Sequence, residues 1–140
     1  MDLDYKNINK LKVAPDHFVE EDGNLYAGNH YLIDMWGCVF LENDKKIKEL
    51  LMSAAKVAGA TILHTHTHHF GEGQGVSGVV VLAESHISVH TWPERNFAAF
   101  DIFMCGNTDP DLSLELLKSK FKPNRVSVKK MKRGLVSQEI

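Results

Sequence analysis

Residues 84–94 carry the side chains best suited to do chemistry, and the apolar stretch 79–83 leads directly into them. Within eleven positions this run holds Glu84, Ser85, His86, His90 and Glu94. A serine hydroxyl can attack the carbonyl carbon of the residue before it, and a nearby imidazole can then move the protons. We therefore predict that Ser85 acts on the chain's own backbone, at its bond to Glu84.

A serine hydrolase is the second interpretation of Ser85, and its surroundings oppose it. Hydrolases of the α/β type present the nucleophile on a turn flanked by glycines, which Ser85 lacks. A triad with Asp101 would require His90 to lie between the two other groups. Residues five apart on an extended strand face opposite sides, so Ser85 and His90 meet within one strand only if the chain is kinked. If Ser85 attacks the Glu84 carbonyl instead, the backbone at that bond must already be distorted, and strain of that kind is typical of functional sites.

The glycine-rich segment 73–78 matches G-x-G-x-x-G, the dinucleotide-binding fingerprint, without the context that the motif needs. The fingerprint opens a helix whose N-terminus receives a pyrophosphate, whereas here an apolar strand follows. We interpret residues 71–75 as a tight loop between two strands, with Ser77 in the same loop region. Ser77 precedes Ser85 by only eight residues in a chain that turns there, which suggests that both hydroxyls serve one site.

His64, His66 and His68 alternate along a predicted strand and would therefore share one of its faces. Three imidazoles on one face can converge on zinc, but such histidines more often line a polar face, an interface or a substrate pocket. We assign no metal on this pattern. Cys105 also allows two interpretations, because a buried cysteine is usually inert, whereas one at a strand end before Gly106 is accessible.

The elements that must position these groups occur in the order strand, helix, several strands, helix, strand. Strands are predicted at residues 30–41, 61–70, 79–83, 87–92 and 97–105 and around Val126 and Val128, and helices at 44–58 and from Asp109–Pro110 onward. The first helix carries one apolar stripe, formed by Ile47, Leu50, Leu51, Ala54 and Ala58. Consecutive strands without helical crossovers favour an antiparallel sheet with both helices on one face, an α+β two-layer sandwich. The other face needs a cover, and a second copy of the chain is the simplest one.

Composition limits the remaining possibilities. A chain of 140 residues is expected to form a single domain, with residues 1–27 as a poorly patterned N-terminal arm that contains an acidic turn. A net charge of −2 opposes general nucleic-acid binding. The two cysteines, the lack of a signal pattern and the lack of a long apolar run predict a cytoplasmic protein without a membrane span.

Two segments of the chain closely resemble the bacterial and archaeal S-adenosylmethionine decarboxylases, which are pyruvoyl-dependent enzymes of spermidine biosynthesis. They are GVSGVVVLAESHISVHTWPE at residues 75–94 and AAFDIFMCG at residues 98–106, and the resemblance extends over about residues 28–130. It implies S-adenosylmethionine as the small-molecule substrate, a pyruvoyl group made from Ser85 as the cofactor, and a homodimer of αβ protomers.

The resemblance also implies a role for each matching residue. The precursor would cleave itself between Glu84 and Ser85 into a β-chain, 1–84, and an α-chain, 85–140, and the pyruvoyl group would take the substrate amine as a Schiff base. By the same resemblance, His90 removes the α-proton during processing, Ser77 assists processing, Cys105 reprotonates the substrate carbon, and Trp92 and Glu94 lie near the nucleoside. The sulfonium of such a substrate is cationic, so the aromatic face of Trp92, Phe70 or Phe97 could stabilise it.

Two other functions stay open at this point. The loop at residues 71–74 and the N-terminal arm depart from many members of the family, and an altered pocket could accept ornithine or arginine at the same pyruvoyl group. A protein of another class, a metal-binding or regulatory module built on His64, His66 and His68, would never cleave at Ser85.

Overall fold

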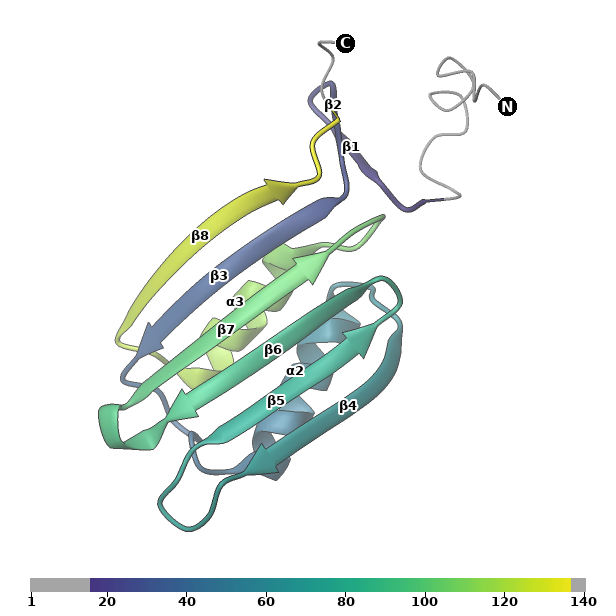
Figure 1. The fold of residues 1–140 in the computed structure, drawn as a ribbon. Coiled ribbons are helices and arrows are strands. Elements are labelled where there is room, and N and C mark those ends of the chain that lie inside the picture. The colour runs from purple at the N-terminus through teal and green to yellow at the C-terminus, as the bar shows by residue number, and fades with distance from the viewer. Residues whose placement is uncertain (1–15, 137–140) are drawn as a thin grey trace.

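The computed structural model describes residues 16–136, in which one six-stranded antiparallel sheet carries two helices on a single face (Figure 1). The strand order is β4-β5-β6-β7-β3-β8. The elements of this unit are β3 (Gly28–Trp36), α2 (Asp44–Val57), β4 (Ile62–His69), β5 (Val76–Leu82), β6 (Ser85–Trp92), the short 3₁₀ helix η1 (Pro93–Arg95), β7 (Phe97–Met104), α3 (Pro110–Phe121) and β8 (Arg125–Arg133). The predicted α+β two-layer sandwich is confirmed.

Helix α2 begins and ends where its capping residues indicate. The side chain of Asn43 accepts a hydrogen bond from the backbone N–H of Lys46 at 3.0 Å, which satisfies one of the free donors of the first turn. The helix stops before Gly59, whose φ of +83° is a conformation that glycine adopts easily. Every residue of the predicted apolar stripe is buried against the sheet.

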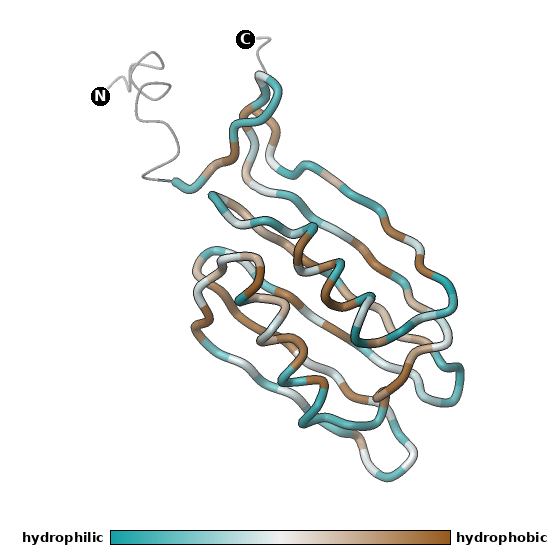
Figure 2. The backbone as a smooth tube through the Cα atoms, turned by 180° about the vertical axis from the view of Figure 1, so that it is seen from behind, coloured by the Kyte–Doolittle hydropathy of each residue, from teal (hydrophilic) through white to brown (hydrophobic). Residues whose placement is uncertain are grey.

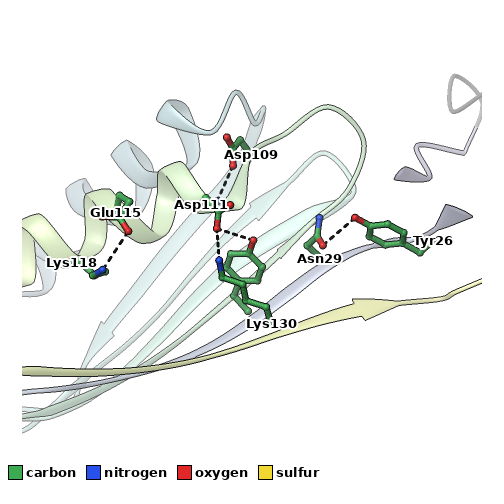
Figure 3. Close-up of polar contacts among 8 residues, drawn as sticks. Tyr26, Asn29, Asp109, Asp111, Glu115, Lys118 and Lys130 are labelled. Carbon is green, nitrogen blue, oxygen red and sulfur yellow. Dashed lines mark hydrogen bonds and ion pairs between the residues drawn. The ribbon is translucent and has the colours of Figure 1, made fainter. Parts of the chain in front are cut away.

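Helix α3 starts with Asp109 as its cap and Pro110 in its first turn, as predicted. Its first turn is also tied to the sheet, because the Tyr31 hydroxyl and the Lys130 ammonium both donate to Oδ1 of Asp111 at 2.9 Å (Figure 3). Tyr31 lies on β3 and Lys130 lies on β8. These contacts hold the start of the helix over the outer two strands of the sheet.

The two faces of the sheet differ in what covers them. Alternate strand residues point toward α2 and α3 and form the apolar core, and Figure 2 shows hydrophobic positions recurring along both helices. The opposite face, called the open face below, has no element of residues 16–136 packed on it. The strand registers place six of the eight histidines on the open face: His30, His64, His66, His68, His86 and His90.

Two strand boundaries differ from the sequence-based prediction by three or more residues. The strand predicted at 30–41 ends at Trp36, because Gly37 turns the chain at φ +75° and a Cβ there would lie 2.3 Å from the Asn124 side chain. Strand β5 begins at Val76, three residues before the predicted start. Ser77 therefore lies in β5, and the prediction that it belongs to the loop was wrong.

The described part of the N-terminal arm has regular structure. Strands β1 (Val19–Glu21) and β2 (Asn24–Tyr26) form a hairpin, with Asp22 at φ +52° and Gly23 at φ +79°. Positive φ at both central residues is typical of the two-residue hairpin turn that Asp-Gly favours. The prediction of an acidic turn is confirmed, whereas residues 1–15 of the arm lie outside the described residues. Within residues 16–136, no helix is both long enough and apolar enough to cross a membrane.

Candidate active site

The bond between Glu84 and Ser85 lies in the tight turn that joins β5 to β6 (Figure 1). Glu84 adopts φ +64°, the left-handed conformation that residues with a Cβ rarely occupy. Ser85 is 8% exposed and is the first residue of β6. The distorted backbone that the sequence argument required at this bond is therefore present.

Cys105 contacts both residues of this bond. Its thiol donates to the carbonyl oxygen of Glu84 at 2.7 Å, and its backbone N–H donates to Oγ of Ser85 at 3.3 Å. The Ser85 Oγ and Cys105 Sγ atoms are 3.4 Å apart. A hydroxyl therefore lies beside a carbonyl that already accepts a hydrogen bond from a thiol, which is the arrangement that nucleophilic attack on that carbonyl needs.

The second cysteine has no such contacts among the described residues. Burial raises the pKa of the Cys38 thiol to about 11, so the thiol stays protonated and unreactive at neutral pH. Of the two cysteines, only Cys105 has the partners for a chemical role.

A second polar pair, Ser77 and His90, lies on the open face. The two residues are directly opposite each other on β5 and β6, and the Ser77 Oγ and His90 Nδ1 atoms are 2.9 Å apart. The indole of Trp92 lies beside His90 and stacks on Phe97, with ring centroids 5.3 Å apart. A hydroxyl and an imidazole joined by a hydrogen bond can transfer protons as a pair.

The residues implied at the substrate lie at the same end of the sheet as this pair. Phe70 lies in the loop between β4 and β5, is 60% exposed, and packs edge-to-face with His68, which is opposite Ser77. Glu94 is exposed on η1, directly after β6.

The candidate residues therefore form two groups at opposite ends of β6. Five residues of extended chain separate Ser85 from His90, which corresponds to about 17 Å at ~3.3 Å per residue. The inference that Ser77 and Ser85 serve one site within one chain is not supported, because the turn at Glu84 sends β6 back past the whole of β5. A single chain thus brings Ser85 to Cys105, and Ser77 to His90, but does not bring the pairs together.

Asp101 does not join a triad with His90. Its Oδ2 atom accepts hydrogen bonds from Nε2 of His30 at 2.7 Å and Nε2 of His86 at 2.8 Å, while Oδ1 accepts one from the Ser88 hydroxyl. Burial alone would raise the pKa of Asp101, but the hydrogen bonds from Ser88, His30 and His86 outweigh it and hold this pKa below its ordinary value. The carboxylate joins three neighbouring strands at the level of Ser88, which is its register partner on β6.

His30, His86 and Asp101 are the one group of possible metal ligands among the residues that the structure describes. The hydrogen bonds of His30 indicate a tautomer that does not suit metal binding. His30 Nε2, His86 Nε2 and Asp101 Oδ2 lie within 4.8 Å of one another. However, Arg133 donates to Nδ1 of His30 at 3.0 Å, and a guanidinium is always a donor. The Nε2 atom of His30 must then carry the hydrogen that Asp101 accepts. His64, His66 and His68 are exposed along β4 and do not converge on one point.

We expect Asp101→Asn to lower the free energy of unfolding at pH 7 by about 1–3 kcal/mol, because three hydrogen bonds to a charged acceptor are weakened. A carboxylate whose pKa is lowered by folding stabilises the protein above its unfolded-state pKa, and this contribution is lost as the pH falls through the folded-state value. The difference from wild type should therefore shrink between pH 7 and pH 3. Urea unfolding measures this difference. Asp34→Asn, also on the open face but on β3, is the control. Equal stabilities of Asp101→Asn and wild type at pH 7 would contradict the expectation.

Comparison with known proteins agrees with this geometry. The sequence profile described as S-adenosylmethionine decarboxylase matches residues 29–134. The chain belongs to the S-adenosylmethionine decarboxylase family. An S-adenosylmethionine decarboxylase proenzyme of Methanococcus vannielii is 43% identical over 115 residues, 80% of this chain and 93% of the relative. One of Thermodesulfovibrio yellowstonii is 43% identical over 117 residues, 81% and 86% of the two chains.

A solved structure of the same family supports the fold. The crystal structure of the adenosylmethionine decarboxylase from Aquifex aeolicus matches with a TM-score of 0.72 and 35% sequence identity, over 81% of this chain and 95% of that one. The resemblance found in the sequence, and the decarboxylase class of enzyme that it implied, are therefore confirmed. Nothing in these matches favours a metal-binding module.

Sequence reasoning missed two histidines that contact the site residues. His17 lies 3.3 Å from the Glu84 carboxylate, and His30 binds Asp101 across 71 positions of the sequence. For His30 the only available signal was its place on the same strand face as other polar residues. For His17 the sequence gives no signal, because it lies in the segment that was interpreted as a poorly patterned arm.

Proposed function

We propose that this protein is a self-processing decarboxylase that converts S-adenosylmethionine to its decarboxylated form and CO2, using a pyruvoyl group made from Ser85. The single observation that carries the proposal is the contact set at the Glu84–Ser85 bond: a left-handed Glu84, a buried Ser85 hydroxyl and the Cys105 thiol on the carbonyl oxygen. These three features together are the ones that cleavage of the Glu84–Ser85 bond would use. The proenzyme relatives support the same conclusion.

The first step is an N-to-O acyl shift. The Ser85 Oγ attacks the Glu84 carbonyl carbon, the hydroxyl proton passes to the departing amide nitrogen, and an ester replaces the peptide bond. Negative charge develops on the Glu84 oxygen in this step, and the Cys105 thiol that already donates to that atom stabilises it. Breaking the peptide bond also releases Glu84 from its unfavourable left-handed conformation, which favours formation of the ester.

The second step needs a base. Removal of the Ser85 α-proton breaks the Cβ–Oγ bond, so Oγ leaves as part of the new Glu84 carboxylate. The dehydroalanine left at residue 85 is converted by water to a pyruvoyl end with release of ammonia. His90 is the base that the family resemblance assigns, and its hydrogen bond to the Ser77 hydroxyl orients the imidazole. The length of β6 keeps this His90 from the Ser85 of the same chain.

A second copy resolves that separation. If two chains pack their open faces together about a twofold axis with strands antiparallel, the Ser77–His90 end of one chain lies over the Ser85–Cys105 end of the other. The open face supplies the surface, because Leu32, Val81 and Trp92 on it are 40–42% exposed. A cavity of about 460 Å³ on this face, whose lining includes His90 and Asp101, would then be enclosed between the copies. Each dimer would contain two complete sites.

The substrate groups follow from the same packing. A sulfonium is cationic, and the aromatic faces of Phe70 and Trp92 can stabilise it, while the Glu94 carboxylate can accept hydrogen bonds from ribose hydroxyls. The pyruvoyl carbonyl supplies the electron sink for loss of CO2 from an amino acid. Cys105 then holds a proton beside the reacting carbon.

CO2 release from labelled S-adenosylmethionine, ornithine and arginine tests the proposal. We expect release from S-adenosylmethionine, with the two basic amino acids at least about 100-fold poorer, because they lack the groups that Phe70, Trp92 and Glu94 would contact. Faster release from ornithine or arginine would contradict the substrate but not the pyruvoyl group. An intact chain that does not release CO2 from any of the three would contradict the whole proposal.

Cys105→Ala is expected to slow self-cleavage by about 10- to 100-fold, because one donor to the developing oxyanion is removed, and to reduce turnover of the chains that do cleave. Cys105→Ser should cleave faster than Cys105→Ala and still turn over poorly, since a hydroxyl donates a hydrogen bond but is a much weaker acid than a thiol. Gel electrophoresis follows cleavage and labelled CO2 follows turnover. Cys38→Ala serves as the matched control, and equal effects of the two alanine variants would contradict this role.

A further inference from the structure

His17 contacts the cleavage turn through both its side chain and its backbone. Its Nε2 atom lies 3.3 Å from a carboxylate oxygen of Glu84, and its carbonyl oxygen accepts a hydrogen bond from the N–H of Gly106 at 2.8 Å. Gly106 directly follows Cys105, whose thiol donates to the Glu84 carbonyl. His17 therefore connects the two chain segments that meet at the scissile bond.

Backbone hydrogen bonds hold the segment of His17 in place. The β1–β2 hairpin begins two residues later, and it is fixed to the end of β8 by bonds from Ala27 N to Arg133 O and from Val136 N to Leu25 O, both 2.8 Å long. The match to the family profile begins at residue 29, so His17 and the hairpin lie outside it. The contact with Glu84 therefore involves a residue outside the part of the chain that the profile matches.

We propose that His17 is a positioning residue for self-cleavage, acting through the side chain of Glu84; this rests on the proposed self-processing. Glu84 must keep a left-handed backbone conformation while its carbonyl oxygen faces the Cys105 thiol, and residues with a Cβ disfavour that conformation. An imidazole that binds the Glu84 carboxylate raises the share of chains in which the turn is ready for attack by Ser85.

The size of the effect follows from exposure. The side chains of His17 and Glu84 are 52% and 50% exposed, and ion pairs of this kind change an equilibrium by about fivefold at most. His17→Ala is therefore expected to slow cleavage by about two- to fivefold without abolishing it. His17→Lys places another donor opposite the same carboxylate and should recover most of the wild-type rate.

Cleavage of full-length precursor after a pulse of cell-free synthesis measures these rates. In a Glu84→Gln background, the expected further effect of His17→Ala is less than about 1.5-fold, because the carboxylate that the imidazole binds is already gone. Lys118→Ala is the matched control: it removes an exposed pair with Glu115, also at 3.3 Å, on the remote helix α3 (Figure 3). It should cleave at the wild-type rate.

Three results would overturn the inference. A wild-type rate for His17→Ala would leave the residue only its backbone contact, and an undiminished His17→Ala effect in the Glu84→Gln background would show that the imidazole does not act through the carboxylate. Failure of His17→Lys to recover the rate would exclude a donor to Glu84 at this position. Failure of the proposed function looks different, because the wild-type precursor itself would then remain uncleaved.

Discussion

Ser85→Ala is expected to leave the protein as one 140-residue chain and to lower decarboxylation by more than about 10³-fold, because the variant lacks both the nucleophile and the atoms that become the pyruvoyl group. The wild type should separate under denaturing conditions into residues 1–84 and 85–140. Mass spectrometry of the second fragment should show a blocked N-terminus in place of serine.

Ser119→Ala, on the exposed side of α3, is the control and should cleave normally. Treatment with hydroxylamine adds a check on the pathway, since it splits an ester and leaves a peptide bond intact. Ser85→Ala should resist it, whereas His90→Ala, stalled before elimination, should break at residue 85. A Ser85→Ala protein with wild-type activity is the result that removes the pyruvoyl mechanism.

Complementation between two inactive chains is the second large expected effect. His90→Ala and Ser85→Ala are each expected to be inactive when produced alone. In a mixed dimer, one site combines the intact Ser85 of the first chain with the intact His90 of the second. That site should process the His90→Ala chain and give roughly half of the wild-type activity per dimer, because one of two equivalent sites is complete.

Co-expression with two different affinity tags, followed by purification through both, isolates the mixed dimer. Doubly tagged His90→Ala dimers are the control and should remain unprocessed. If the mixed dimer also stays unprocessed, Ser85 and His90 act within one chain and the geometry along β6 has been misread. Failure to recover material through both tags would reject the dimer itself.

Local signals in the sequence predicted most secondary structure well. The caps at Asn43 and Asp109 and the stop at Gly59 act through neighbouring backbone groups, so the residues that decide them are adjacent in sequence. The end of β3 was missed although its signal is also local: Gly37 turns the chain at φ +75°. Only the tertiary structure shows that the Asn124 side chain leaves no room for a Cβ at this position.

The same distinction between local signals and distant contacts applies to the candidate site. The residue types of the run 84–94, and its ordered match to a known family, pointed to the Glu84–Ser85 bond and to the candidate groups around it without any coordinates. The sequence could not tell which of those groups meet, because that depends on strand pairing between distant segments. Register alone brings Cys105 to the Glu84 carbonyl, joins Asp101 to His30 and His86, and keeps His90 a strand's length from Ser85.

What the chain by itself determined was therefore its chemistry: a serine after a carboxylate residue, histidines and a thiol, in the order that one family uses. Only the tertiary structure decided how these groups are assembled. The turn at Glu84 sends β6 back along β5, so Ser77 lies opposite His90, whereas Ser85 lies at the other end of β6. The same packing brought His17, remote from the motif, to the side chain of Glu84.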